Sequence, residues 1–300
     1  MNWGKTSISL NISKQEDLQK VYDLIIDSDI VITSYKPGDA TKLKVNYDVL
    51  STINPKLIYG DISGYTSKPK SGYDAIIQAE SGFMYMNGQK DSPPTKMPVA
   101  LIDILTAHQL KEGILVALLN REHTGKGDFV EVSLFDSAIS SLSNQATNWL
   151  IGNKNPERIG SEHPNIVPYG TVFYDAKNQP LVLAIGSDKH FSILCQILTI
   201  PEIAINHKFK HNQQRVVNRI ELISILTDKI KLVDRHDFLT QLEEKKSPAG
   251  AVHNVKEALE TKEAKRLILE KENIKGVKNI AFRMQKMDMN DDILPPPIFQ

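Results

Sequence analysis

The segment from Pro98 to Gly127 constrains the fold most, because it joins an apolar stretch to a long and largely apolar helical pattern. Residues 99–102 form a short apolar run, and Asp103 follows it directly. Apolar residues then recur at helical spacing on more than one side: Ile104, Leu105, Ala107, Leu110, Ile114, Leu115, Ala117, Leu118 and Leu119. Gly125 and Gly127 end the pattern. We therefore expect a helix that is buried on two faces.

Asp103 lies where this helix begins, close to unpaired backbone N–H groups and the positive end of the helix dipole. That environment favours the ionised carboxylate over the acid. Two interpretations follow from the residues alone. Asp103 is either an ordinary N-cap, for which Asp is among the best residues, or a catalytic carboxylate.

The first half of the chain alternates between strand and helix patterns. Strands are predicted at 7–10, 29–33, 57–65 and 129–135, and helices from Lys14, at 45–53, at 73–83 and at 136–151. Short apolar strands separated by helices are typical of a parallel sheet covered on both sides. We expect residues 1–152 to form a large α/β domain of this kind, with residues 82–98 as a surface loop.

The second half begins with a long polar segment and has a different pattern. Strands are predicted at 171–174, 181–185 and 249–252, and helices at 189–199, 219–232, 235–244 and 255–259. Residues 153–170 are then a linker and active-site loop, since a loop of that length is usually functional. Residues 171–260 form a smaller α+β domain. Residues 261–300 form a C-terminal arm, charged and solvated at 262–275 and extended at ILPPPIFQ.

Composition excludes several classes of protein. Thirty-six basic and thirty-six acidic residues leave no net charge to attract nucleic acid. A single cysteine fits a reducing, cytoplasmic compartment, and no apolar run is long enough for a membrane span. Eight scattered histidines argue against a zinc site, so no metal is expected. Glycine-rich phosphate loops and GxSxG or HExxH motifs are also absent, which leaves a carboxylate as the candidate catalyst.

A series of segments in collinear order resembles the class III coenzyme A transferases, which include the formyl-CoA and carnitine CoA transferases. The segments are GKTSISL, IVITSYKPG, INPKLIYGDISGY, GYDAIIQAESG, PVALIDILTAHQLKEGILVALLNREHTGKGDFVEVSLFDSA, RIGSEHPNIVPYGTVF, KFKHNQQRVVNR, SPAGAVHNVKEAL and LPPPI. Within the family they look closest to the succinyl-CoA:glutarate type. The resemblance covers nearly the whole chain.

The resemblance implies a Rossmann-like parallel-sheet large domain, a smaller α+β domain, and two subunits that interlock as a homodimer with the C-terminal arm returning toward the large domain. It implies that Asp103 is the nucleophile, because the family's aspartate stands in the same apolar context at the start of a long helix. The substrates would be an acyl-CoA thioester and a small carboxylic acid, with no tightly bound cofactor.

The same resemblance points to three further catalytic residues, Tyr73, Asp74 and Gln78. α-Methylacyl-CoA racemases resemble GHD where this chain reads Gly72-Tyr73-Asp74, and their histidine acts as an acid or base. Tyrosine, with an ordinary pKa near 10, is a poor base at neutral pH. A racemase-like enzyme is therefore the alternative. Asp74 and Gln78 also permit a plainer interpretation, as a helix cap and a solvated polar residue.

Coenzyme A binding is predicted at the loop after the 29–33 strand and at a few separate positions. The residues are Lys5, Ser34, Tyr35, Lys36, Lys42, Gly64 and His163. Tyr35 would lie against the adenine and the lysines would meet phosphates, although each lysine alone also fits a solvated surface charge. His163 belongs to a segment that is mobile in the family.

The family usually has a strand and glycine turn ahead of the position of Trp3, and a last helix beyond Pro297. The resemblance therefore implies a large domain that is incomplete at its N-terminus. A catalytically inactive, truncated member of the family is the second alternative.

Overall fold

The structure is a computed structural model that describes residues 2–67, 70–271, 273–278, 280–282 and 284–285. These residues divide into two compact units, one of which is Asn11–Asn165. The other combines the described parts of Met1–Leu10 and Ile166–Gln300. The boundary falls within the predicted linker, but the four-part division into domains stays a prediction. The ILPPPIFQ tail lies outside the described residues.

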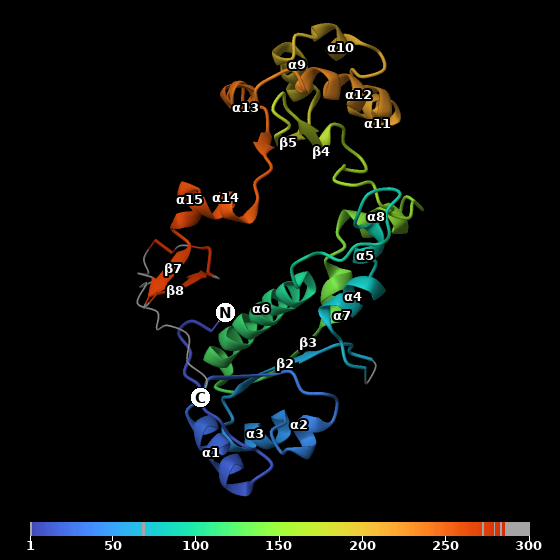
Figure 1. Cartoon of the computed structure of the whole chain (residues 1–300). Helices are drawn as coiled ribbons and strands as arrows, with labels where there is room; N and C mark the ends of the chain where they lie inside the picture. The colour runs from blue at the N-terminus through green and yellow to red at the C-terminus, as the bar shows by residue number, and fades with distance from the viewer. Residues whose placement is uncertain (1, 68–69, 272, 279, 283, 286–300) are drawn as a thin grey trace. The chain divides into compact units, whose positions relative to one another are not determined.

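A parallel sheet organises the Asn11–Asn165 unit (Figure 1). Its strands are β1 (Ile30–Thr33), β2 (Ile58–Ser63) and β3 (Phe129–Ser133), in the order β1-β2-β3. Both neighbouring pairs are parallel, with Ile30 opposite Ile58 and Ser63 opposite Ser133. The predicted parallel sheet is therefore confirmed. All three carboxyl ends lie at one edge, where ligands of open α/β sheets bind.

Helices connect and cover these strands. They are α1 (Gln15–Ile26), α2 (Asp39–Lys42), α3 (Tyr47–Ile53), α4 (Asp74–Glu80), α5 (Phe83–Met86), α6 (Leu101–Thr124), α7 (Leu134–Ser140) and α8 (Asn144–Leu150). The predicted helix at 73–83 ends at Glu80, residues 83–86 of the predicted surface loop form α5, and the predicted helix at 136–151 is broken in two. Gly82 separates α4 from α5 with φ +89°, and Ser143 separates α7 from α8 with φ 52°, backbone angles that a right-handed helix does not contain.

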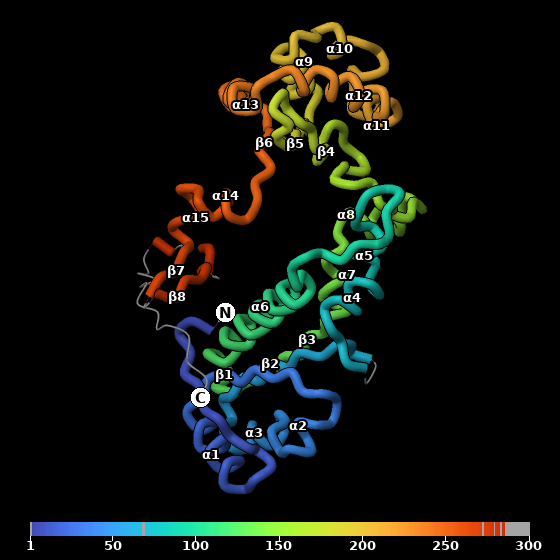
Figure 2. Tube along the Cα trace, in the orientation of Figure 1, coloured from blue at the N-terminus to red at the C-terminus, as the bar shows by residue number. Residues whose placement is uncertain are grey.

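The sheet lies between α1 and α3 on one face and α6 on the other (Figures 1 and 2). Successive strand residues point to opposite faces. Tyr59 accordingly belongs to the cluster that contains Leu18 and Leu50, whereas its neighbour Ile58 packs with Leu110 of α6. Burial of large side chains on both faces explains why these strands read as continuous apolar runs.

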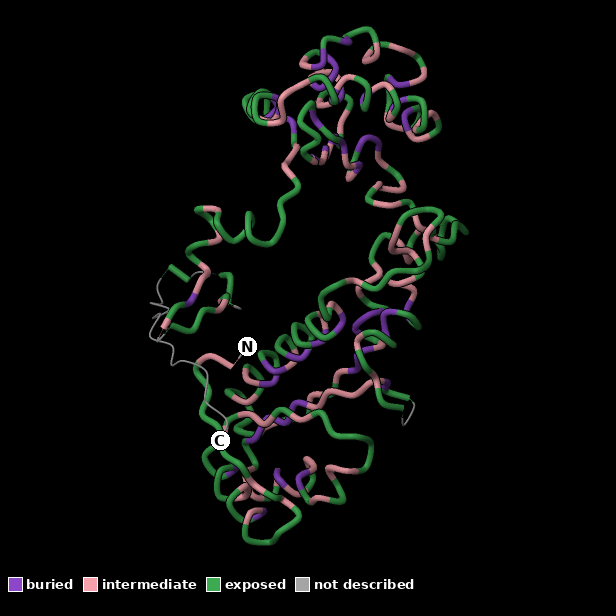
Figure 3. The backbone as a smooth tube through the Cα atoms, viewed as in Figure 1, coloured by how far each residue is buried: buried purple, intermediate pink, exposed green. Residues whose placement is uncertain are grey.

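Helix α6 is buried on one face only, so the prediction of burial on two faces is wrong. Its buried residues are Ile102, Thr106, Leu110, Ile114 and Ala117. On the opposite side Leu115, Val116 and Leu119 are 53%, 66% and 67% exposed. Figure 3 shows the buried positions facing the sheet and exposed ones facing away. Helix α6 therefore carries more apolar surface than the sheet covers.

The second unit is built on an antiparallel sheet in the order β4-β5-β6. Its elements are β4 (Tyr169–Tyr174), β5 (Pro180–Ala184), α9 (Asp188–Ile197), α10 (Pro201–Ile205), α11 (Asn212–Val217), α12 (Arg219–Ile230), α13 (Arg235–Glu244), β6 (Ala249–Ala251), α14 (Val255–Glu260), α15 (Lys262–Lys265), β7 (Ile268–Lys271) and β8 (Ile274–Val277). Phe173, Phe191 and Leu226 are buried in one core between this sheet and its helices. The α+β character predicted for this half is confirmed.

Two local predictions in this unit are wrong. The charged stretch 262–275 is helical only at α15, and β7 and β8 then pair as an antiparallel hairpin. Residues 7–10 form no strand. The chain near the N-terminus instead lies against the hairpin, since a Cβ added at Gly276 would be 2.4 Å from Trp3 Nε1. Alternation alone could not show that contact.

The remaining global features concern the thiol and the membrane. Burial raises the pKa of the Cys195 thiol to about 12, so this cysteine is a core residue with little thiolate to react. Within the part of the chain that the structure describes, none of the helices combines the length and apolar character that a membrane span needs.

Candidate active site

The start of α6 carries the predicted nucleophile, and Asp103 is not its N-cap. Ala100 holds the N-cap position without a side-chain cap, and Asp103 is the third residue of the helix, exposed to solvent. Alanine is among the poorest N-cap residues. The N-cap interpretation of Asp103 is therefore wrong, and the amides of the first turn need another acceptor.

Asp74, the first residue of α4, supplies that acceptor. The Ile102 N–H donates to Asp74 Oδ1 at 2.8 Å. The other carboxylate oxygen, Oδ2, accepts from Gln78 Nε2 at 2.6 Å. Gln78 is fully buried, and its Oε1 accepts from the Met97 N–H at 2.9 Å. Two side chains of α4 thus hold the segment 97–102 around the helix start.

This arrangement leaves one donor beside Asp103. Leu101 N–H bonds Val99 O, Ile102 N–H bonds Asp74, and Ile104 N–H bonds Ala100 O. Among the described residues, the Asp103 N–H is the amide of the first turn that has no acceptor. A free amide at a helix N-terminus is suited to a developing negative charge.

The helix dipole was expected to favour the ionised carboxylate, but that expectation is wrong, since the pKa of Asp103 is raised above its usual value of 3.8. Partial burial of the carboxylate is the larger cause, and the nearby negative charge of Asp74 adds to it. Both effects disfavour the ionised form, which makes the carboxylate a stronger base and nucleophile than an ordinary solvated aspartate. The electrostatics therefore fit a reacting group better than a surface charge.

Gln78 and Tyr73 differ in how far they can take part in chemistry. Gln78 is buried and both ends of its amide are bonded, so it acts by holding Asp74 rather than by touching a substrate. Tyr73 is the N-cap residue of α4 and is 70% exposed. The structure brings Asp74 and Gln78 to Asp103, and it places Tyr73 next to them in the chain with its ring accessible.

Gly64, predicted to bind coenzyme A, has a packing role. A Cβ at Gly64 would lie 2.3 Å from the backbone nitrogen of Gly72, and one at Gly72 would lie 2.5 Å from Gly64 Cα. The two backbones are therefore in direct contact. That contact sets residues 72–74 beside the carboxyl end of β2, and so places Asp74.

The predicted nucleotide loop lies at the same edge of the sheet. Ser34, Tyr35 and Lys36 follow the carboxyl end of β1, and all three are exposed. Lys42 is exposed on the short helix α2 that starts after Gly38, a glycine with φ +86°. The loop follows β1 and Gly64 follows β2, and these two strands are parallel neighbours. The loop and Gly64 therefore lie at the same edge of the sheet.

Lys5 and His163 complete the predicted set. Lys5 belongs to the other unit, where its Nζ donates to Asn2 Oδ1 at 3.1 Å. It is therefore not part of the group formed within Asn11–Asn165. His163 is half-buried in the long loop after α8, and its Nδ1 accepts from the Asn165 N–H at 3.1 Å.

A sequence model of CoA-transferase family III matches residues 1–296 of the chain. The chain belongs to this family. It is 35% identical to the succinate–glutarate CoA-transferase of Agrobacterium fabrum over 85% of this chain and 64% of that protein. It is 31% identical to the human succinyl-CoA:glutarate CoA-transferase over 99% of this chain and 70% of that protein.

A solved structure agrees with these sequence matches. A CAIB/BAIF family protein from Brucella suis superposes with a TM-score of 0.86 at 33% identity, covering 99% of this chain and 79% of that one. This family III chain spans 56%, 64% and 70% of the length of the first three curated relatives. Family and fold are thus shown, and the activity of the whole protein is a matter for proposal.

Two further contacts of this family III chain were not predicted. The Met97 contribution is a backbone N–H, which no side-chain pattern can reveal. Arg158 of the long loop donates from Nη1 to the carbonyl of Tyr85 at 2.6 Å. A lone arginine in a polar loop resembles a solvated charge, so its contact with a backbone carbonyl has no sequence signal.

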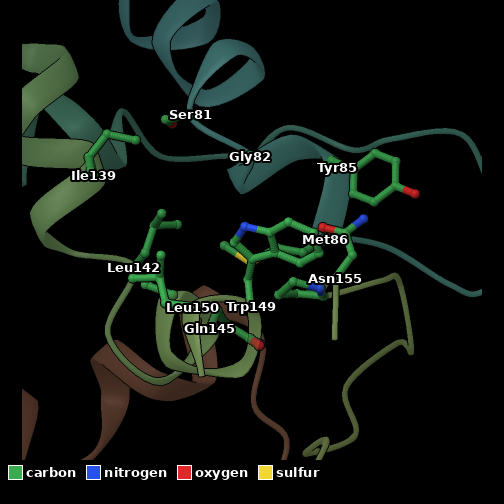
Figure 4. Close-up of a pocket in the computed structure, with 12 residues that line it drawn as sticks. Ser81, Gly82, Tyr85, Met86, Ile139, Leu142, Gln145, Trp149, Leu150 and Asn155 are labelled. Atoms are coloured by element: carbon green, nitrogen blue, oxygen red, sulfur yellow. The ribbon is translucent and has the colours of Figure 1, made fainter. Parts of the chain in front are cut away.

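An apolar pocket of about 320 Å³ is lined by residues of α5, α7 and α8 and of the segments beside them (Figure 4). Tyr85, Met86, Leu142 and Trp149 are among its lining residues. Carbon atoms make up most of its wall, and the described residues hold no group of three or more His, Cys, Asp or Glu side chains fit for a metal. No Asp or Glu is among the lining residues, so the candidate for carboxylate chemistry is Asp103 and not this pocket.

Replacing Asp103 by asparagine should leave the chain at least as stable as the parent at pH 7. A raised pKa means that Asp103 contributes most to stability below its unfolded pKa, about 3.9, and that this contribution is lost as the pH rises through the higher folded value. Asparagine has no such loss. The advantage of Asp103→Asn in denaturant unfolding should therefore shrink as the pH falls below about 4.

The Asp74→Ala background serves as the matched control. Without the neighbouring charge, Asp103→Asn should raise the free energy of unfolding at pH 7 by less than it does in the parent. Asp74→Ala itself should lower that free energy by about 1 kcal/mol, because the cap of α6 is lost. An Asp103→Asn variant that is clearly less stable than the parent at pH 7 would show that the raised pKa is wrong.

Proposed function

We propose that this chain transfers coenzyme A between small carboxylic acids, with Asp103 as the nucleophile. The single observation that carries the proposal is an exposed carboxylate of raised pKa at the start of a helix whose first turn leaves one amide free. Membership of CoA-transferase family III supports the reaction class. The substrate is a coenzyme A thioester, and no tightly bound cofactor is required.

The first half-reaction begins when a carboxylate oxygen of Asp103 attacks the thioester carbonyl. The C–S bond breaks, CoA leaves as its thiolate, and a mixed anhydride joins Asp103 to the acyl group. The thiolate then attacks the aspartyl carbonyl and expels the acyl group as its carboxylate. Asp103 now carries CoA as a thioester, and no net proton has been gained or lost.

The second half-reaction repeats these steps with the acceptor. Its carboxylate attacks the aspartyl thioester, releases CoA thiolate and forms a new anhydride. The thiolate then attacks the acceptor's carbonyl, which yields the new acyl-CoA and restores the Asp103 carboxylate. Each attack creates an oxyanion, and the free Asp103 N–H is a donor at this point of the chain.

Substrates are best sought among small dicarboxylates. The names of two relatives pair succinate or succinyl-CoA with glutarate. We propose succinyl-CoA as donor and glutarate as acceptor, with the exposed loop of Ser34, Tyr35, Lys36 and Lys42 meeting the nucleotide and its phosphates. Lys5 and His163 stay predictions for coenzyme A binding, as does a cytoplasmic location. No observation favours the racemase alternative.

The test is exchange of CoA from succinyl-CoA to glutarate, followed by chromatography of the thioesters. The parent chain should form glutaryl-CoA, and Asp103→Asn should lower the rate by about three orders of magnitude or more, because an amide cannot form the anhydride. Asp48→Asn, exposed on α3, is the matched control and should keep the parent rate. A parent chain without exchange, or an active Asp103→Asn variant, would contradict the proposal.

We also propose that the chain forms a homodimer through the exposed apolar side of α6. Leu115, Val116 and Leu119 present there the carbon surface that monomers seldom leave in contact with water. A second copy would cover this side, as the sheet covers the other.

Light scattering after gel filtration at micromolar concentration should therefore report a dimer. The double variant Leu115→Glu/Leu119→Glu should shift the mass to that of a monomer, because two charges would be buried at the interface. Gln19→Glu, exposed on α1 at the other face of the sheet, should leave the dimer intact. A parent chain that is monomeric under these conditions would contradict the assembly.

A further inference from the structure

The loop between α8 and residue 165 is attached at both ends to one residue of α8. The Lys154 N–H donates to the Asn148 carbonyl at 2.9 Å, and Asn165 Nδ2 donates to Asn148 Oδ1 at 3.2 Å. His163 lies close to the second attachment. The loop is therefore closed at its base, and its middle is free to bind elsewhere within the Asn11–Asn165 unit.

The middle of the loop binds the segment that follows α4. Arg158 Nη1 donates to the Tyr85 carbonyl at 2.6 Å, and the guanidinium carbon lies 5.1 Å from the centroid of the Tyr85 ring. The Gly160 N–H donates to the Gly88 carbonyl at 2.9 Å. A hydrogen bond and a cation–π contact on the same residue fix the direction of the arginine more firmly than a solvated ion pair would.

Two glycines allow this close approach. Gly88 has φ +123°, and a Cβ there would lie 3.3 Å from Arg158 Cδ and 2.9 Å from Ser92 Oγ. Gly160 has φ +67°, and a Cβ there would lie 2.7 Å from Gln89 Oε1. Both positions need glycine for their backbone angles and for space. The two segments therefore meet backbone to backbone.

The segment held by Arg158 also leads to the nucleophile. Asn87 and Thr95 pair through two bonds, the Thr95 N–H to the Asn87 carbonyl at 3.2 Å and Asn87 Nδ2 to the Thr95 carbonyl at 2.7 Å. Two residues later, the Met97 N–H donates to buried Gln78, which in turn holds Asp74. Asp74 then accepts from Ile102, the neighbour of Asp103.

We propose that Arg158 is a positioning residue for the reaction at Asp103. Its contact with Tyr85 and the Gly160–Gly88 bond, together called the Arg158 latch, hold the His163 loop on residues 85–97. Through Met97 and Gln78 the latch fixes the orientation of Asp74 at the start of α6. The latch itself does not depend on the proposed function, whereas its effect on CoA transfer does.

The contrasting role for Arg158 is a general contribution to folding. A merely structural arginine would lower the stability of the whole unit when removed, and every peptide would respond together. A latch acts locally, since residues 87–97 and 151–165 contain no helix or strand and are held by few bonds. Hydrogen exchange followed by mass spectrometry separates the two, because it reports each peptide by itself and needs no activity.

The experiment compares the parent chain with Arg158→Met, Arg158→Lys and the control Lys154→Met, which removes an exposed cation from the same loop. Arg158→Met should speed exchange about tenfold in peptides covering 85–97 and 156–163, including the Met97 amide, and leave the 166–251 peptides unchanged. Arg158→Lys keeps a cation near the Tyr85 ring, so its hydrogen-exchange rates should lie between those of the parent and those of Arg158→Met. Lys154→Met should match the parent.

Unchanged exchange at 85–97 in Arg158→Met, or a uniform increase across all peptides, would overturn the proposal. A kinetic arm then measures succinyl-CoA to glutarate exchange. Arg158→Met should lower kcat about tenfold or more with little change in KM for succinyl-CoA, because the nucleophile is displaced while the nucleotide loop is untouched. If hydrogen exchange confirms the Arg158 latch but the parent chain transfers no CoA, the result would contradict the proposed function and leave the latch standing.

Discussion

One hydrogen bond, from the Ile102 N–H to Asp74 Oδ1, connects the fold to the chemistry. The N-cap residue of helix α6 is Ala100, which has no side chain able to cap it, so the first turn of the helix depends on a carboxylate from α4. The same carboxylate brings a negative charge near Asp103 and helps raise its pKa. In the proposed mechanism, one carboxylate therefore both caps the helix and helps to raise the pKa of the nucleophile. Removing Asp74 would affect both.

Other parts of the Asn11–Asn165 unit support that contact. The parallel sheet supports α6 along its buried face through Leu110 and Ile114. At the carboxyl end of β2, the backbone contact between Gly64 and Gly72 fixes where α4 starts. Gln78 then ties Asp74 to Met97 in a fully buried position. Gly64 and Gln78, which were predicted as site residues, thus make contacts that position Asp74.

The sequence predicted what depends on local pattern and failed where a distant partner decides. The parallel strands, the long helix and the place of Asp103 at its start follow from apolar periodicity and glycine signals. The exposed side of α6 was mispredicted because periodicity records which residues are apolar, not what covers them. The hairpin at 268–277 was missed because its charges hide the pairing. Met97 and Arg158 act on or through backbone atoms, which carry no signal in a sequence.

Direct detection of a covalent adduct at Asp103 tests the central claim. The chain is mixed with succinyl-CoA without an acceptor, treated with sodium borohydride and digested, and the peptide containing residues 101–111 is sequenced by mass spectrometry. An aspartyl-CoA thioester at Asp103 would be reduced to the alcohol, so residue 103 should read as homoserine only when succinyl-CoA was present. An unmodified Asp103 in a chain that demonstrably exchanges CoA, or the reduced alcohol at another aspartate or at a glutamate, would contradict the account.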